Sequence, residues 1–191
     1  MTSYRVTDLV AGLPATGPFV GPEAQERAQG RVFDARIGAN ENMFGPSPTV
    51  IDAIVEMAGD SWMYGDPELH DLRHAIARHH EIPVGNVAIG EGIDGLLGYF
   101  CRMFIESGDS VVTSAGAYPT FNYHVMGYGG QLETAPYRDD HEDIERLLKR
   151  ATDVKAKLLY VANPDNPMGT WWDAPAMSSM MSRISEGRCY C

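Results

Sequence analysis

The sequence has little that would place the protein in a membrane or a secretory pathway. No apolar run is long enough to cross a bilayer, and the start, MTSYRVTDLV, lacks the basic and apolar regions of a signal peptide. Cysteine is scarce, since only Cys101, Cys189 and Cys191 occur, and three cysteines do not make a disulfide framework. These absences favour a reducing, cytoplasmic setting.

Basic residues are also few. The 15 lysines and arginines face 26 aspartates and glutamates, so the net charge is -11, which disfavours nucleic acid and anionic membranes as partners. The three lysines, Lys149, Lys155 and Lys157, all flank one predicted helix-to-strand connection. His70 and His74 have helical spacing but lack the glutamate of an H-E-x-x-H motif, so we expect no metal site.

Short apolar strands alternate with amphipathic helices along most of the chain, which predicts βαβ units and an α/β fold with a mainly parallel sheet. Strands are predicted at 87–89, 110–113, 131–134 and 157–162, and helices at 50–58, 68–80, 94–105, 120–126, 142–150 and 174–184. Residues 1–48 are rich in glycine and proline and are predicted to form an irregular N-terminal arm. Residues 49–184 form the predicted domain, and 185–191 a tail in which a further strand begins.

The loop Asn163–Gly169, with the sequence NPDNPMG, follows the predicted strand at 157–162. Its two prolines fix φ and end strand pairing, while the Asn166 amide can both donate and accept hydrogen bonds. Open α/β sheets bind ligands at the carboxyl ends of parallel strands. The loop is therefore either a rigid turn or part of a ligand site.

Two other turns follow predicted strands. Gly90–Gly95 matches the G-x-G-x-x-G pattern and opens a helix, where free N–H groups favour an anion. A monophosphate anchor, a dinucleotide site and a plain tight turn all stay open, although the next strand does not end in the acidic residue that a dinucleotide site needs. Tyr118, just past that strand, could stack on a flat cofactor ring or simply pack in its loop.

These turns, together with Asn40–Pro48 and Tyr64–Leu69, occur in an order and spacing that resembles the fold-type I pyridoxal-phosphate-dependent aminotransferases (class I/II), and most of all the histidinol-phosphate aminotransferase group. The resemblance runs from about Gly38 to Thr170 and implies an incomplete three-layer αβα large domain. It also implies a transaminase that moves an amino group between an amino acid or amino-phosphate and a 2-oxo acid, with pyridoxal 5'-phosphate as cofactor.

The resemblance implies a role for each matching residue. Gly92, Ile93 and Asp94 would hold the cofactor phosphate, Tyr118 would stack on the pyridine ring, and Asn166 would hydrogen-bond its phenolic oxygen. Tyr64 would reach the phosphate in the partner subunit of a homodimer. The substrate entrance would be lined from Gly38 through Ala39 and Asn40 to Asn42.

The chain also departs from the family pattern. Asp165 stands where asparagine is usual and Met168 where threonine is usual. The family's later elements have no counterpart: the aspartate at the pyridine nitrogen, the lysine that binds the cofactor covalently and the carboxylate-binding arginines. We therefore expect no catalytic residue here and a truncated or frameshifted aminotransferase that is inactive alone. The alternatives are a nucleotide- or dinucleotide-binding α/β enzyme and a non-catalytic fragment that dimerises with a full-length homologue.

Overall fold

The computed structural model describes residues 5–14, 17, 19–38, 41–184 and 189–190. The chain divides into two compact units, one made of Met1–Phe19 with Glu91–Cys191 and the other of Val20–Gly90. The predicted arm is thus shared between the two units. The predicted domain boundaries at residues 48 and 184 stay predictions.

The unit Val20–Gly90 is helical in its described part. It contains α2 (Pro22–Gln29), α3 (Pro48–Met57), η1 (Ala58–Asp60), α4 (His70–His80) and η2 (Val84–Asn86). Helix α3 starts two residues before the predicted range 50–58, because the Ser47 hydroxyl accepts a hydrogen bond from the Val50 N–H and caps the helix.

Two predictions in this unit were wrong. The arm is not irregular throughout, because α2 begins with a proline in its first turn and ends at Gly30 in the left-handed conformation (φ 70°). Its sequence is mostly polar, so it gave no apolar periodicity. Residues 87–89 do not form a strand, since no described strand lies beside them to pair with.

The other unit contains a parallel sheet with the strand order β2-β1-β3-β4. The strands are β1 (Ser110–Ser114), β2 (Gln131–Ala135), β3 (Leu158–Leu159) and β4 (Cys189–Tyr190). The helices are α1 (Asp8–Ala11), α5 (Gly92–Phe104), α6 (Pro119–Gly127), α7 (Ile144–Asp153) and α8 (Ala174–Ser182). Strand β3 is shorter than predicted, and β4 is the strand expected to begin in the tail.

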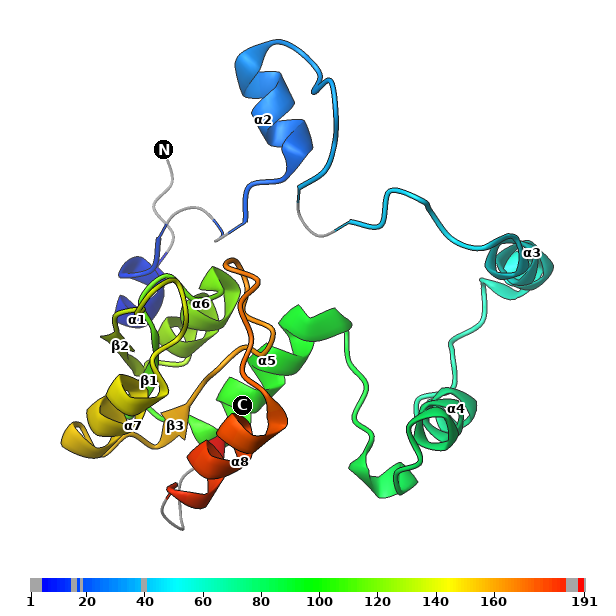
Figure 1. Ribbon diagram of the computed structural model, residues 1–191. Coiled ribbons are helices and arrows are strands. Elements are labelled where there is room, and N and C mark those ends of the chain that lie inside the picture. Colours follow the sequence, from blue (N-terminus) through cyan, green and yellow to red (C-terminus); the bar gives the residue numbers. More distant parts are fainter. Residues whose placement is uncertain (1–4, 15–16, 18, 39–40, 185–188, 191) are drawn as a thin grey trace. The chain divides into compact units, whose positions relative to one another are not determined.

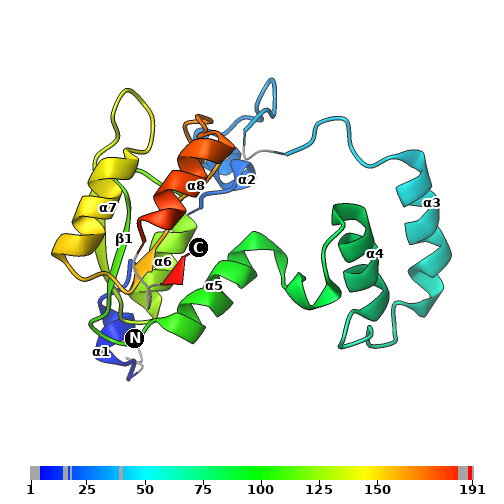
Figure 2. The ribbon, with the colours of Figure 1, turned by 60° about the horizontal axis from the view of Figure 1, so that its bottom comes forward.

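Helices cover both faces of this sheet. Val111 and Leu158 pack with α5 and α6, whereas their neighbours Val112 and Leu159 point the other way and pack with α7 and α8. The strand β1 lies between α6 and α7 in both views (Figures 1 and 2). The predicted three-layer α/β arrangement is therefore confirmed.

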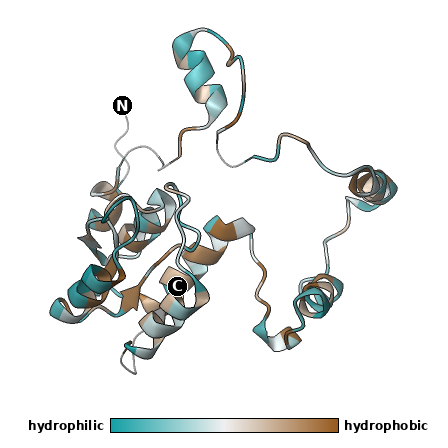
Figure 3. Cartoon of the chain, viewed as in Figure 1, coloured by the Kyte–Doolittle hydropathy of each residue, from teal (hydrophilic) through white to brown (hydrophobic). Residues whose placement is uncertain are grey.

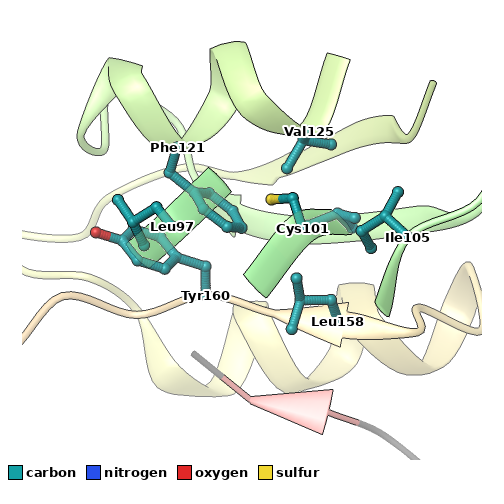
Figure 4. Packing of buried hydrophobic residues seen from close by; sticks show 8 residues of the cluster. Leu97, Cys101, Ile105, Phe121, Val125, Leu158 and Tyr160 are labelled. Carbon is teal, nitrogen blue, oxygen red and sulfur yellow. The ribbon is translucent and has the colours of Figure 1, made fainter. Parts of the chain in front are cut away.

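The centre of the first layer is an apolar cluster built from α5, α6 and β3 (Figure 4). Phe121 is fully buried, and its ring stacks on that of Tyr160 with the centroids 4.1 Å apart. Strand β3 and much of α5 are coloured hydrophobic, whereas α7 is largely hydrophilic on its visible side (Figure 3). No helix in the described part of the chain is long and apolar enough to cross a membrane.

Candidate functional site

The loops after β1 and β3 leave the sheet at the same edge. The two strands are parallel neighbours, with Val112 opposite Leu159, and the Tyr160 N–H donates to the Val112 carbonyl at 2.9 Å. The chain after β1 leads to Tyr118, and the chain after β3 leads to Asn166. Two of the predicted site residues therefore follow the carboxyl ends of adjacent strands, where α/β sheets bind ligands.

The start of α5 is open to an anion. Gly92 has a φ of 73°, and the preceding residue, Glu91, makes no side-chain capping hydrogen bond to the helix. The Glu91 carboxylate instead accepts a hydrogen bond from the Tyr99 hydroxyl at 2.9 Å. The first N–H groups of the helix, at Gly92, Ile93 and Asp94, thus receive no capping hydrogen bond from the Glu91 side chain, and all three residues are exposed.

His124 is a residue of this region that the sequence did not reveal. Its Nε2 lies 2.7 Å from Oδ1 of Asp94, which joins α6 to the first turn of α5. Gly98 makes room for the imidazole, because a Cβ there would lie 3.0 Å from Cε1 of His124. Thirty positions separate the two partners, so only the packing of α5 on α6 brings them together.

Tyr118 is half-buried and packs against the apolar cluster of the first layer. It immediately precedes α6, whose first residue is Pro119. The cluster thus restrains one side of the ring. The stacking role of the other side stays a prediction.

Asp165 organises the loop that carries Asn166. Its backbone N–H donates to the Thr170 carbonyl at 2.8 Å, its carbonyl accepts from the Gly169 N–H at 2.9 Å, and its carboxylate accepts from the Met168 N–H at 3.3 Å. Asn166 itself is half-buried, and its amide has no hydrogen-bond partner among the residues that the structure describes. A ligand that both donates and accepts would satisfy it.

A buried polar cluster lies beside this loop, and sequence analysis missed it as well. The Tyr137 hydroxyl donates to the Asp165 carboxylate, with distances of 3.0 and 3.2 Å to its two oxygens. Burial, followed by this hydrogen bond, raises the pKa of Tyr137. Burial also raises the pKa of Glu142 to about 7, and the charge of Asp165 acts in the same direction.

The remaining predicted site residues lie elsewhere in the chain. Tyr64 belongs to the unit Val20–Gly90, where its side chain is fully exposed. Gly38 is exposed in the same unit, whereas Ala39 and Asn40 lie outside the described residues. The roles given to these residues stay predictions.

The three lysines lie away from the carboxyl ends of the strands, where the candidate site residues follow. Lys157 directly precedes β3 and pairs with Asp109, which precedes β1, at 2.8 Å. Lys149 pairs with Asp153 near the end of α7 at 2.5 Å. Lys155 lies in the turn between α7 and β3. Lys157 and Lys155 therefore lie at the amino-terminal edge of the sheet, where β3 begins.

Comparison with known proteins decides the family. Residues 35–190 match the family described as aminotransferase class I and II. The chain belongs to the class I and II aminotransferases. It corresponds to the amino-terminal half of their domain.

Histidinol-phosphate aminotransferases are among the similar proteins. That of Rhodospirillum rubrum is 34% identical over 187 residues, which are 98% of this chain and 49% of the relative. The crystal structure of the Sinorhizobium meliloti enzyme in complex with pyridoxal 5'-phosphate is 53% identical, with a TM-score of 0.93 over 99% of this chain and 50% of that one. The chain spans about half the length of the curated relatives it matches.

The residues present fit pyridoxal phosphate. The uncapped start of α5 suits a phosphate, because its N–H groups and helix dipole favour an anion. The unpartnered amide of Asn166 suits a phenolic oxygen, and Tyr118 offers an aromatic face near the same sheet edge.

Gly92→Ala is expected to destabilise the unit that contains the sheet by about 1–2 kcal/mol, because a Cβ is strained at a φ of 73°. Urea unfolding followed by circular dichroism measures this loss. Gly127→Ala is the matched control, since no heavy atom lies within 4 Å of a Cβ there and its φ is outside the left-handed range. Equal effects at the two positions would contradict a special backbone at Gly92.

Proposed function

We propose that this chain is the half of a pyridoxal-phosphate-dependent histidinol-phosphate aminotransferase that binds and orients the cofactor. The whole protein would move an amino group between an amino-phosphate or amino acid and a 2-oxo acid. The observation that carries the proposal is the 53% identity, over 99% of this chain, to the Sinorhizobium meliloti enzyme that was crystallised with pyridoxal phosphate. The open start of α5 and the unpartnered Asn166 amide support it.

In this proposal the chain binds and orients the cofactor. The N–H groups of Gly92, Ile93 and Asp94 donate to the phosphate, and His124 holds Asp94 in place. Tyr118 stacks on the pyridine ring, and Asn166 donates to the phenolic oxygen. When bound, pyridoxal phosphate supplies an electron sink for the charge that develops at the substrate's α-carbon.

We further propose that the whole protein is a homodimer in which Tyr64 reaches the phosphate of the partner subunit and Gly38–Asn40 line the substrate entrance. The exposure of Tyr64 supports this role, because its side chain contacts nothing that would hide it within its own unit. Helix α3 has no buried residue, and Ile54, Val55 and Met57 are all exposed apolar side chains that a partner would cover. Sedimentation of the purified chain measures self-association, and a monomer at all concentrations would count against it.

Asn166→Ala should weaken binding of the cofactor by about two- to tenfold, the loss of about 0.5–1.5 kcal/mol expected for one hydrogen bond. The ligand for this test is pyridoxamine 5'-phosphate, which has no aldehyde and so cannot react with surface lysines. Isothermal titration of the 191-residue chain gives the affinity.

The exposed Asn86, in the other unit, provides the control Asn86→Ala, which should bind like the unchanged chain. An unchanged affinity in Asn166→Ala would remove Asn166 from the site. Absence of any binding by the unchanged chain would contradict the proposed cofactor role of this half.

A further inference from the structure

The proposed cofactor contacts leave one buried acid unused. Glu142 is 1% exposed, and neither oxygen of its carboxyl has a partner in hydrogen-bonding geometry among the described residues. The hydroxyl of Ser114, at the end of β1, is also buried, and this hydroxyl and the Ala162 N–H are the polar groups that interact with the Glu142 carboxyl. Burial of this carboxylate costs more than these two contacts return, so the neutral acid is the form that this environment favours.

The charges around Glu142 agree with this. Burial is the main cause that raises its pKa to about 7, and Asp165 adds to the rise, while the nearby Ser114 hydroxyl and Ala162 N–H oppose it. The cations of the adjoining cleft are already engaged: Arg138 pairs with Asp143, and Arg183 pairs with Glu145. The other titratable or charged groups near Glu142 are Tyr137, Asp139, His141 and Arg146.

The segment that contains Glu142, residues 137–142, is hydrogen-bonded to the loop that carries Asn166 and to the residues after it. The Tyr137 hydroxyl donates a hydrogen bond to the Asp165 carboxylate. The Thr170 hydroxyl donates to the Asp140 carbonyl at 3.1 Å, and the Trp172 indole N–H donates to the Glu142 carbonyl at 3.0 Å. Residues 137–142 thus contact Asp165 within the loop and two residues that follow it. The charge of Asp165 disfavours a charge on Glu142, so ionised Glu142 and Asp165 repel each other.

We propose that Glu142 is a positioning residue for the proposed cofactor site: its neutral carboxyl lets Asp165 hold the Asn166 loop, and its ionisation repels Asp165 and loosens that loop. The cofactor part of this proposal rests on the role given to Asn166 above. The Asn166 amide should therefore be held in position to bind the cofactor in weakly acidic solution, and held less firmly in alkaline solution.

The sign of the pH effect follows from the direction of the shift. The pKa of Glu142 in the folded chain, about 7, lies above its ordinary value of 4.5. The folded state therefore holds the proton more tightly than the unfolded state does. The stability that this group contributes is fully present below about pH 4.5 and is lost as the pH rises through about 7.

The test follows the loop in the ¹⁵N-labelled 191-residue chain from pH 5.5 to 8.5. The protection factor of the Gly169 N–H, which bonds to the Asp165 carbonyl, should fall about two- to tenfold across this range, as expected for weakening of one hydrogen bond. The affinity for pyridoxamine 5'-phosphate should fall by a similar factor. Glu142→Gln, which mimics the neutral acid, should abolish both transitions.

Two variants keep the test decisive. Glu145→Gln changes an exposed carboxyl on α7 beside the same cleft and should keep the transition of the unchanged chain. Asp165→Asn removes the opposing charge and should abolish the transition even where Glu142→Gln fails to fold. Comparison among variants at each pH also cancels the titration of the ligand's own phosphate, whose second pKa is near 6.

The outcomes separate the two proposals. A transition in loop protection that Glu142→Gln removes, without any ligand binding, would support Glu142 as the positioning group and overturn only the cofactor role of the loop. Ligand binding with no transition in protection or affinity between pH 5.5 and 8.5 would overturn the role of Glu142 and leave the proposed function intact. A transition that survives in both Glu142→Gln and Asp165→Asn would also overturn it.

Discussion

The 191-residue chain is expected to transaminate no faster than free pyridoxal phosphate does in the same solution. The reaction needs a lysine at the cofactor that takes and returns the substrate's proton, and a positioned general base contributes about 10²–10⁴-fold to a rate. Lys157 is instead paired with Asp109 and Lys149 with Asp153, at the amino-terminal edge of the sheet. A coupled assay for the amino acid formed from a 2-oxo acid acceptor, with histidinol phosphate as amino donor, measures the rate.

The three lysines also provide the control. Replacing each by arginine keeps the charge and removes the primary amine, and the background rate should not change. Turnover above that of free cofactor that disappears in one of these variants would place a catalytic lysine in this chain and contradict the site described above.

Phe121→Ala is expected to destabilise the unit that contains the sheet by about 3–5 kcal/mol, the usual cost of removing a buried phenylalanine ring. Phe121 is fully buried, stacks on Tyr160 and belongs to the cluster that joins α5, α6 and β3. The substitution removes this ring and leaves a cavity between α6 and the sheet. Because total stability is usually only about 5–15 kcal/mol, we expect the variant to lose a large part of its folded population at 37 °C.

Urea unfolding followed by circular dichroism gives the free energy of unfolding for this comparison. Phe19→Ala is the matched control, since that ring is 64% exposed and surface changes usually stay within about 0.5 kcal/mol. A loss below about 1 kcal/mol in Phe121→Ala would show that the cluster in Figure 4 does not hold the first layer together.

The strands and helices of the sheet unit could be predicted because their signals are local. Val111 and Val112 form an apolar pair between turn residues, and β1 was found within one residue of its observed end. The strand expected at 87–89 has the same kind of sequence, but no strand lies beside it in the described part of the chain, and a strand needs a partner. The polar helix α2 gave no periodic signal, although its proline and glycine mark both ends.

Some residues of the candidate site have local sequence signals, and others can be recognised only from the fold. Gly92, Tyr118 and Asn166 could be proposed because each lies in a turn with unusual local chemistry. His124, Tyr137 and Glu142 could not, because their significance comes from contacts across the fold. His124 meets Asp94 only where α6 packs on α5, and Glu142 follows a run of acidic residues that is typical of a solvated helix start.

The central claim is that the start of α5, Tyr118 and the Asn166 loop form one site for the cofactor. Titration of the ¹⁵N-labelled 191-residue chain with pyridoxamine 5'-phosphate tests it most directly. We predict saturable shifts of the backbone amides of Gly92, Ile93 and Asp94 and of the side-chain amide of Asn166, all with one dissociation constant. Shifts confined to other residues, or different dissociation constants for the α5 amides and for Asn166, would contradict a single site.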